Sequence, residues 1–339
     1  MKQTNSIGGL LWRDRIILMI LPVFAAFAAL AIGRMNLPPL EILKILGSRL
    51  TGAPELDPQE ASVVFDVRLP RILLALLVGA GLSVSGCAFQ SLFSNPLATP
   101  DTLGVASGSS FGAAIALLLG FNLIGVQTLA FVFGVAAVFL TWFSGARKGG
   151  INTMILAGIM IGSLFSALVS LVKFAADTES QLPAITYWLM GSLNSAGYNA
   201  LALGAPPILG GILILYLLRW RLNILPLPDD DARATGTDLR LLRALTVICA
   251  TAVTASCVSM CGQVGWVGLL VPHICRMKYG SNHMTLVPAS VCVGAAFMVL
   301  VDTIARSATS AEIPISILTA IIGAPFFIIL MRRTEGWQL

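Results

Sequence analysis

The chain alternates between long apolar stretches that contain no charged residue and shorter polar connections. A helix needs about 20 apolar residues to cross a bilayer, and a charged side chain is costly at the bilayer centre. We therefore interpret each charge-free stretch as one or more transmembrane helices. The stretches are Ile16–Gly33, Ile72–Pro100, Thr102–Ala146, Gly149–Val172, Ser180–Leu218, Ala244–Cys275, Tyr279–Val301 and Ile313–Met331.

Three of these stretches are too long for a single crossing. We expect Thr102–Ala146 to form two helices with a break near residues 120–125, where glycines flank the connection. Ser180–Leu218 is expected to form one short interfacial helix and one span, with interruptions at Gly197 and at the pair Pro206-Pro207. Ala244–Cys275 is expected to form a span, a turn and a broken second helix. The best count is ten spans, within a range of nine to eleven.

Composition supports this interpretation. Hydrophobic residues make up 57% of the 339 residues and charged residues only 11%, whereas a soluble domain carries about a quarter of its residues charged. The predicted fold class is therefore an all-α integral membrane protein, with one transmembrane domain over residues 1–339. The first apolar run exceeds the h-region of a signal peptide and many similar runs follow it, so we expect it to be retained.

Positive charge gives the expected orientation. With ten helices and an internal amino end, most of the 21 Lys and Arg residues fall on the inner side, which predicts that both termini are cytoplasmic. The net charge of +5 then reflects topology, and we expect no nucleic acid partner. In this orientation the polar stretch 36–67 is a periplasmic loop. The stretch 223–243 is cytoplasmic, and its pattern predicts a short helix, a turn and a second short helix.

Two sequence segments show a faint internal similarity. Gly104–Ala114 and Pro288–Ala296 share small residues in a similar order, about 180 residues apart. If this similarity is real, residues from about 68 to 175 and from about 244 to 332 form two halves of opposite orientation, an arrangement that is common in transporters.

Several polar residues lie within or beside the apolar stretches. Asn95–Asp101 is a polar break with two prolines, and a plain loop and a turn that gates a pathway are both compatible with it. Asp302 and Arg306 are spaced to pair on one helix face; a structural ion pair, a proton-relay carboxylate and a docking arginine remain open. His273 and His283 have no carboxylate at ligand spacing, so we interpret both as structural.

The sequence lacks the motifs of several enzyme classes. There is no Gly-Lys pair and hence no phosphate-binding P-loop, and neither HExxH nor GxSxG occurs. The six cysteines form no CxxC and lie in apolar runs, so we expect no disulfide framework and no metal site. We therefore expect a protein that is not an enzyme and holds no cofactor. If ATP drives it, a separate subunit hydrolyses the ATP.

Short motifs follow one another in a fixed order over residues 15 to 333. They include Arg68–Arg71, Leu77–Ala80, Asn95–Pro100, Tyr187–Ser192, Gly265–His273 and Thr319–Pro325. In this order the chain resembles the FecCD-type permeases, the membrane subunits of ABC importers for iron siderophores, haem and cobalamin. The match is specific for the family and weak for the substrate.

The resemblance implies a type II ABC importer fold and a set of partners. These are a second permease copy, giving a homodimer, ATP-binding cassette subunits that use ATP and Mg, a periplasmic or lipid-anchored binding protein, and membrane lipid. It implies a multi-pass protein of a bacterial or archaeal cytoplasmic (inner) membrane that imports its cargo by alternating access. An iron(III)-siderophore is the first candidate, with haem, cobalamin and molybdate or tungstate as alternatives. A proton-coupled secondary transporter that works through Asp302 is the rival of another class.

The resemblance also implies roles for three groups of residues. Arginines at the outer mouth would dock the binding protein: Arg68, Arg71 and Arg306. A cytoplasmic segment would couple to the ATPase: Pro228, Asp229, Asp230, Asp231, Arg233 and Gly236. The inner gate would consist of Asn95, Leu97, Gly150, Ile151 and Asn152. The chain departs from the family pattern at Pro228, Thr235 and Asn282.

Overall fold

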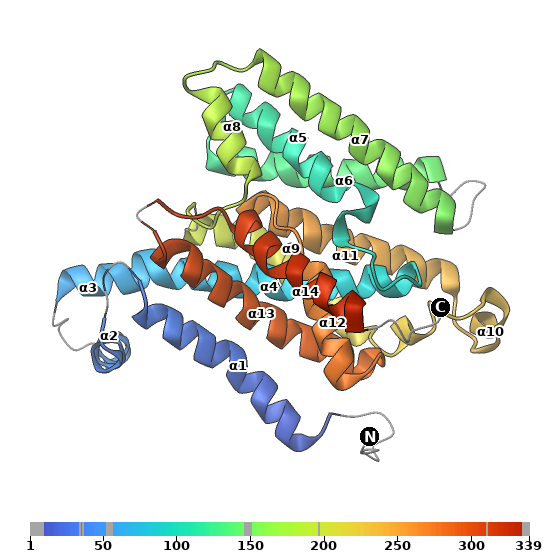
Figure 1. Cartoon of the computed structure of the whole chain (residues 1–339), viewed down its shortest axis with the longest axis horizontal. Coiled ribbons are helices and arrows are strands. Elements are labelled where there is room, and N and C mark those ends of the chain that lie inside the picture. The colour runs from blue at the N-terminus through green and yellow to red at the C-terminus, as the bar shows by residue number, and fades with distance from the viewer. Residues whose placement is uncertain are drawn as a thin grey trace.

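A computed structural model describes residues 10–33, 35, 37–51, 57–145, 151–195, 197–309 and 311–333. These residues form helices joined by turns and contain no strand, as Figure 1 shows. Seven of the helical segments are long and apolar enough to cross a membrane. They are α1 (Trp12–Ala31), the continuous segment that ends in α4 (Leu69–Leu92), α6 (Leu123–Gly145), α7 (Ile151–Ala175), α9 (Tyr198–Leu217), α11 (Leu239–Cys261) and α13 (His283–Ser307).

Three shorter helices accompany these segments, and the count of ten spans stays a prediction. These helices are α5 (Val105–Leu118), α12 (Val267–Tyr279) and α14 (Ile315–Arg333). The connection between α5 and α6 covers residues 119–122, and a turn separates α11 from α12, so both predicted breaks are present. The short helix predicted before α9 is α8 (Gln181–Leu189), and Gly197 is the N-cap of α9.

One predicted interruption is wrong. Pro206 and Pro207 lie inside α9, which continues through them to Leu217. Helix-breaking residues are tolerated in membrane helices when neighbouring helices support them, and α9 packs along α11.

α4 is the central helix of the bundle, and α9, α11, α12 and α13 pack around it (Figure 1). Glycines permit the closest approaches. A Cβ atom at Gly79 would lie 2.1 Å from the carbonyl oxygen of Gly294 on α13, and one at Gly86 would lie 1.9 Å from that of Gly268 on α12. Small residues at such contacts let helix backbones touch where lipid gives no hydrophobic drive for association. The helices α5, α6 and α7 form a second layer beside this group.

The stretch 36–67, predicted as a loop, is largely helical where it is described. It contains α2 (Pro39–Thr51), α3 (Pro58–Ser62) and a π-helical turn, η1 (Val63–Arg68), that runs directly into α4. Ile42 and Ile45 form the buried face of the first helix, one turn apart, while Leu40 and Leu43 on its other side are exposed. Its periplasmic side stays a prediction.

The stretch 223–243 contains one short helix rather than two. After η3 (Arg221–Asn223) comes α10 (Asp229–Ala234), and Gly236 follows it with a left-handed φ of +74°. The second predicted helix is instead the first turn of α11. The side chain of Asp238 accepts the backbone N–H groups of Arg240 and Leu241, and the helix then continues without a break into the apolar span. The division into halves at 68–175 and 244–332 stays a prediction.

Candidate functional site

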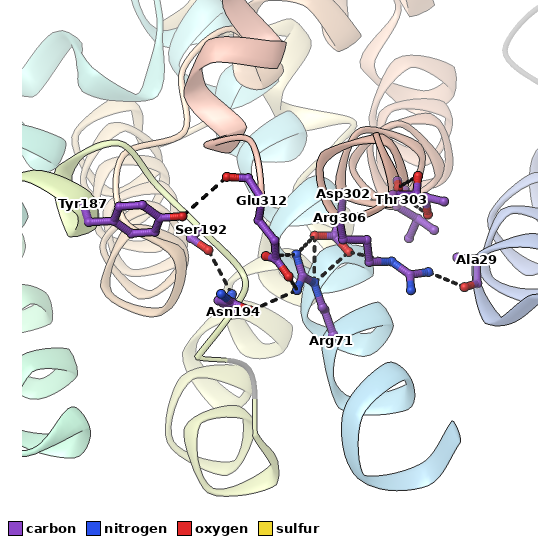
Figure 2. A network of polar contacts seen from close by, with 11 residues as sticks. Ala29, Arg71, Tyr187, Ser192, Asn194, Asp302, Thr303, Arg306 and Glu312 are labelled. Carbon is purple, nitrogen blue, oxygen red and sulfur yellow. Dashed lines mark hydrogen bonds and ion pairs between the residues drawn. The ribbon is translucent and has the colours of Figure 1, made fainter. Parts of the chain in front are cut away.

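A buried charge cluster joins α4 to α13 and to the chain before α14, as Figure 2 shows. We call it the Arg71 cluster: Arg68, Arg71, Asn194, Asp302, Arg306 and Glu312. Arg71 Nη2 lies 2.9 Å from Asp302 Oδ1, and Arg71 Nη1 and Nη2 each lie 3.0 Å from one carboxylate oxygen of Glu312. Arg71 Nη1 also donates to Asn194 Oδ1 at 3.3 Å, and Arg71 Nε donates to Asp302. All five N–H groups of this guanidinium are thus used.

Two further arginines bind the end of α1. Arg306 Nε lies 3.8 Å from Asp302 Oδ2, and its Nη2 donates to the carbonyl oxygen of Ala29. Arg68 donates to the carbonyl oxygens of Leu30 and Met35. Cationic side chains are favourable there because the last carbonyls of a helix carry partial negative charge.

The structure brings the three predicted docking arginines close to one another. Their side chains are buried: Arg68 is 4% exposed, Arg71 7% and Arg306 8%. Two carboxylates, Asp302 and Glu312, face three guanidinium groups, so this region carries one excess positive charge. Glu312 is the more accessible carboxylate, with a side chain 17% exposed against 2% for Asp302. The docking role of the arginines stays a prediction.

Asp302 belongs to this network rather than to an open pathway. It is 1% exposed, and both its carboxylate oxygens accept from Arg71. Of the alternatives left open by the sequence, this geometry favours the structural ion pair, although Arg71 rather than Arg306 supplies the shorter contacts.

The predicted gate residues lie in two separate parts of the chain, the turn after α4 and the start of α7. The side chain of Asn95 accepts the backbone N–H of Leu97 at 2.9 Å, which forms a tight turn after α4. Leu97 is 61% exposed, and Asn152 is exposed in the first turn of α7, which begins at Ile151. Gly150 lies outside the described residues. The gating role stays a prediction.

Neutral hydrogen bonds hold the start of the predicted coupling segment. Asn223 Oδ1 accepts the backbone N–H of His283 at 2.9 Å and lies 2.9 Å from His283 Nδ1. Asn223 Nδ2 donates to Asn282 Oδ1 at 3.1 Å, and that oxygen also accepts the N–H of Met284. We call Asn223, Asn282 and His283 the Asn223 cluster. A carboxylate oxygen at the position of Asn282 could accept the same two bonds.

The helix α10 presents charge on a small apolar base. Ala232 packs in a cluster with Ile224 and Leu239. Arg243 Nη2 lies 2.7 Å from Asp229 Oδ1, and this hydrogen bond lowers the pKa of the Asp229 carboxyl below its usual value.

Two of the three departures from the family pattern lie at the two ends of α10. Pro228 is the N-cap and Thr235 the C-cap, and the Thr235 hydroxyl donates to the carbonyl oxygen of Ala232 at 2.7 Å. The remaining predicted coupling residues are exposed: Asp230, Asp231, Arg233 and Gly236.

Sequence reasoning did not identify Asn194 as a partner of Arg71, nor Asn223 as the anchor of the coupling segment. No role was expected of Glu312. Among the described residues, no group of three or more His, Cys, Asp and Glu side chains is arranged to hold a metal ion.

Comparisons with known proteins agree on one family. Residues 19–333 match the model of the FecCD transport family. Over 321 residues the chain is 45% identical to the molybdate import system permease protein MolB of Haemophilus influenzae, covering 94% of this chain and 95% of the relative. Over 282 residues it is 38% identical to the cobalamin import system permease protein BtuC of Halobacterium salinarum, covering 82% and 76%.

A solved structure has the same architecture. It is described as an inward-facing conformation of a metal-chelate type ABC transporter, and it matches with a TM-score of 0.86 and 42% identity over 95% of this chain and 99% of the other. The predicted fold class, an all-α ABC permease fold, is confirmed. The chain is a multi-pass membrane transport protein and belongs to the FecCD transport family.

Proposed function

We propose that this chain is the permease subunit of an ATP-driven importer that carries a metal chelate or metal oxyanion across a cytoplasmic membrane. The observation that carries the proposal is the match to the FecCD transport family over residues 19–333. Two copies of the permease, ATP-hydrolysing subunits and a substrate-binding protein would form the working assembly. ATP and Mg would bind to the partner ATPase.

The cytoplasmic contact would be made by α10. Asp230, Asp231 and Arg233 are exposed on this helix, while Asn223 fixes the start of the segment to α13. A partner that binds the exposed charged side chains of α10 would move this helix, and the hydrogen bonds of Asn223 would transmit the movement to α13. This supports the coupling role of the segment from Pro228 to Gly236.

The substrate-binding protein would dock over the Arg71 cluster. The excess positive charge there attracts an acidic surface, and such steering weakens as salt increases. Because Arg71 is already saturated by hydrogen bonds, an incoming carboxylate would have to displace Glu312, the more exposed of its two carboxylate partners, to reach it. Arg68 and Arg306 would then act by holding the excess charge in place.

Alternating access would require an inner gate. The exposed turn at Asn95 and Leu97 is a connection between helices, and Ile151 and Asn152 belong to the first turn of α7, so both parts of the proposed gate lie at helix ends. Connections change their φ and ψ angles with less loss of packing than helices do.

Molybdate is the cargo to test first, because a relative that is named for molybdate import is 45% identical over nearly the whole chain. The sequence-based expectation of an iron(III)-siderophore stays a prediction, with haem, cobalamin and tungstate as further alternatives.

The decisive experiment is to tag the chain in its native membrane, extract it in mild detergent and measure the mass and ATPase activity of the complex. We expect two permease copies with two ATPase subunits, and ATP-dependent accumulation of molybdate in vesicles that contain the assembly. A lone, ATPase-free chain that still transports would overturn the proposal. In that case loss of transport in Asp302→Asn would support the proton-coupled rival.

A further inference from the structure

An apolar hollow of about 510 Å³ lies between α6 and α11. On α6 its wall runs from Phe131 to Trp142, and on α11 from Ala244 to Ala252. At 1.5 Å of rise per residue, the α6 wall is about 16 Å long. Thr251 supplies the one hydroxyl of the lining, and that buried oxygen has no hydrogen-bond partner among the described residues. The hollow therefore has the shape and polarity for a long hydrocarbon group.

The hollow opens on the surface of the bundle. Phe139 on α6 and Ile248 on α11 belong to its lining and are 68% and 63% exposed. Both helices are among the long apolar segments, so this opening faces the hydrocarbon layer or another protein within it. A ligand can enter sideways without any rearrangement of the core.

Positive charge lies beyond one end of the hollow. Arg240 is exposed on α11 and is four residues before Ala244, so both lie on the same face of the helix. Arg243 is paired with Asp229, whereas no ion pair among the described residues involves Arg240. Trp142 lines the same end of the hollow and is the kind of side chain that is enriched at the membrane interface.

We propose that this hollow binds one acyl chain of an anionic phospholipid, whose headgroup phosphate lies at Arg240. The chain fills the apolar wall from Trp142 toward Phe131, and the guanidinium selects the charged headgroup. The proposal depends on the membrane location of the chain and not on its transport function.

A second copy of the chain fits this face less well. A two-fold axis perpendicular to the membrane would place the two α11 helices parallel, so that each Arg240 would lie at the same depth as the other. Where that axis passes beside this face, the two Arg240 side chains approach each other as like charges. A phospholipid brings the opposite charge and a flexible chain that follows the hollow.

The test uses the full-length chain in phosphatidylglycerol and phosphatidylcholine vesicles whose acyl chains carry bromine, which quenches tryptophan fluorescence on contact. The signal of Trp142 is obtained as the difference between the wild type and Trp142→Phe. We expect strong quenching of Trp142, and loss of most of it in Ala244→Leu, which fills the end of the hollow that Trp142 lines. Ala202→Leu, at an exposed alanine of α9 outside the hollow, is the matched control and should leave the quenching unchanged.

Headgroup selection is tested separately, so the proposal does not depend on the folding of the filled variant. We expect Arg240→Gln to reduce the preference for phosphatidylglycerol roughly fivefold. Arg219→Gln should keep it, because Arg219 lies over the ring of Tyr216 at the end of α9. Thr251→Val, which removes the hydroxyl and keeps the shape, should bind the lipid as the wild type does.

Three results would overturn the proposal. The first is Trp142 quenching that is the same in Ala244→Leu as in the wild type. The second is an unchanged headgroup preference in Arg240→Gln. The third is a Trp142 signal that bromine does not reach while the protein is dimeric, which would identify a second copy as the occupant of this face.

Discussion

The Arg71 cluster and the Asn223 cluster lie near opposite ends of the central helix α4 and are built in contrasting ways. At the first, three guanidinium groups and two carboxylates are buried together, with the closest ion pair at 2.9 Å. At the second, neutral amide, imidazole and backbone groups bond to one another near the surface. Among the described residues, one ion pair lies beside the second cluster. It joins Asp229 to Arg243 and is largely open to solvent.

This difference separates two tasks. A buried charge cluster whose central guanidinium, that of Arg71, has every N–H group bonded changes only when its partners move, so it fixes α4, α13 and the chain before α14 as one body. Neutral hydrogen bonds cost about 1 kcal/mol each to break, and a segment that they hold can shift when a partner pulls on it. We therefore expect the first region to determine stability and the second to determine coupling.

The largest effect is expected from Asp302→Ala. It leaves the Arg71 and Arg306 guanidinium groups buried without their shared carboxylate, which should lower the free energy of unfolding by about 3–5 kcal/mol. The midpoint of detergent-induced unfolding measures this change. The double variant Asp302→Ala, Arg71→Met should recover much of the loss, and a single variant as stable as the wild type would contradict the assignment.

A smaller loss is expected from Gly86→Ala, which tests whether α4 joins the two regions rigidly. The added Cβ would lie 1.9 Å from the carbonyl oxygen of Gly268, so α4 and α12 must separate, at a cost of about 1–3 kcal/mol. Gly210→Ala on α9 is the control, because no atom lies within 4 Å of its added Cβ. Thermal unfolding of the two purified variants compares them directly. Equal melting temperatures would show that α4 and α12 accommodate the added methyl group at Gly86 without loss of stability.

Asn223→Ala should affect coupling more than stability. It removes the bonds to Asn282 and His283, with an expected loss of about 1–2 kcal/mol. The ratio of transport to ATP hydrolysis in the assembled complex should fall further than the unfolding midpoint implies. Asn282→Asp is the matched variant, since a carboxylate oxygen accepts the same two bonds, and it should behave as the wild type does.

The smallest effect is expected from Asp229→Asn, because the ion pair with Arg243 is exposed and screened. The pKa of Asp229 is lowered in the folded protein, so its stabilising contribution is present above the usual carboxyl pKa. It is lost as the pH falls through the lowered pKa. Any difference between variant and wild type should therefore exist at neutral pH and vanish in acid, as unfolding midpoints over a pH series would show. A difference that grows in acid would contradict this sign.

The helices could be predicted because bilayer thickness and the cost of buried charge act on local sequence. The break between α5 and α6 and the turn before α12 follow from that rule alone. The pair Pro206-Pro207 did not, because the packing of α9 on α11 overrides the local preference of proline.

The candidate site was predictable only in part. The family motifs singled out Arg71 and Asp302, but 231 residues separate them, and no local pattern reveals that they pair. The same holds for Asn223 and His283, which are 60 residues apart in the sequence. They come together only when the start of α13 packs against η3. Sequence motifs identified the important arginines, and the tertiary fold determined their partners.

The Arg71–Asp302 pair also sets an order for biosynthesis. Arg71 emerges from the ribosome 231 residues before Asp302, and at 5–20 residues per second its partner follows roughly 10–50 s later. During that interval the guanidinium has no carboxylate from α13, and the start of α4 must remain where water or lipid headgroups solvate it. Insertion of α13 then completes the site, so a chain truncated before Asp302 should be a substrate for membrane quality control.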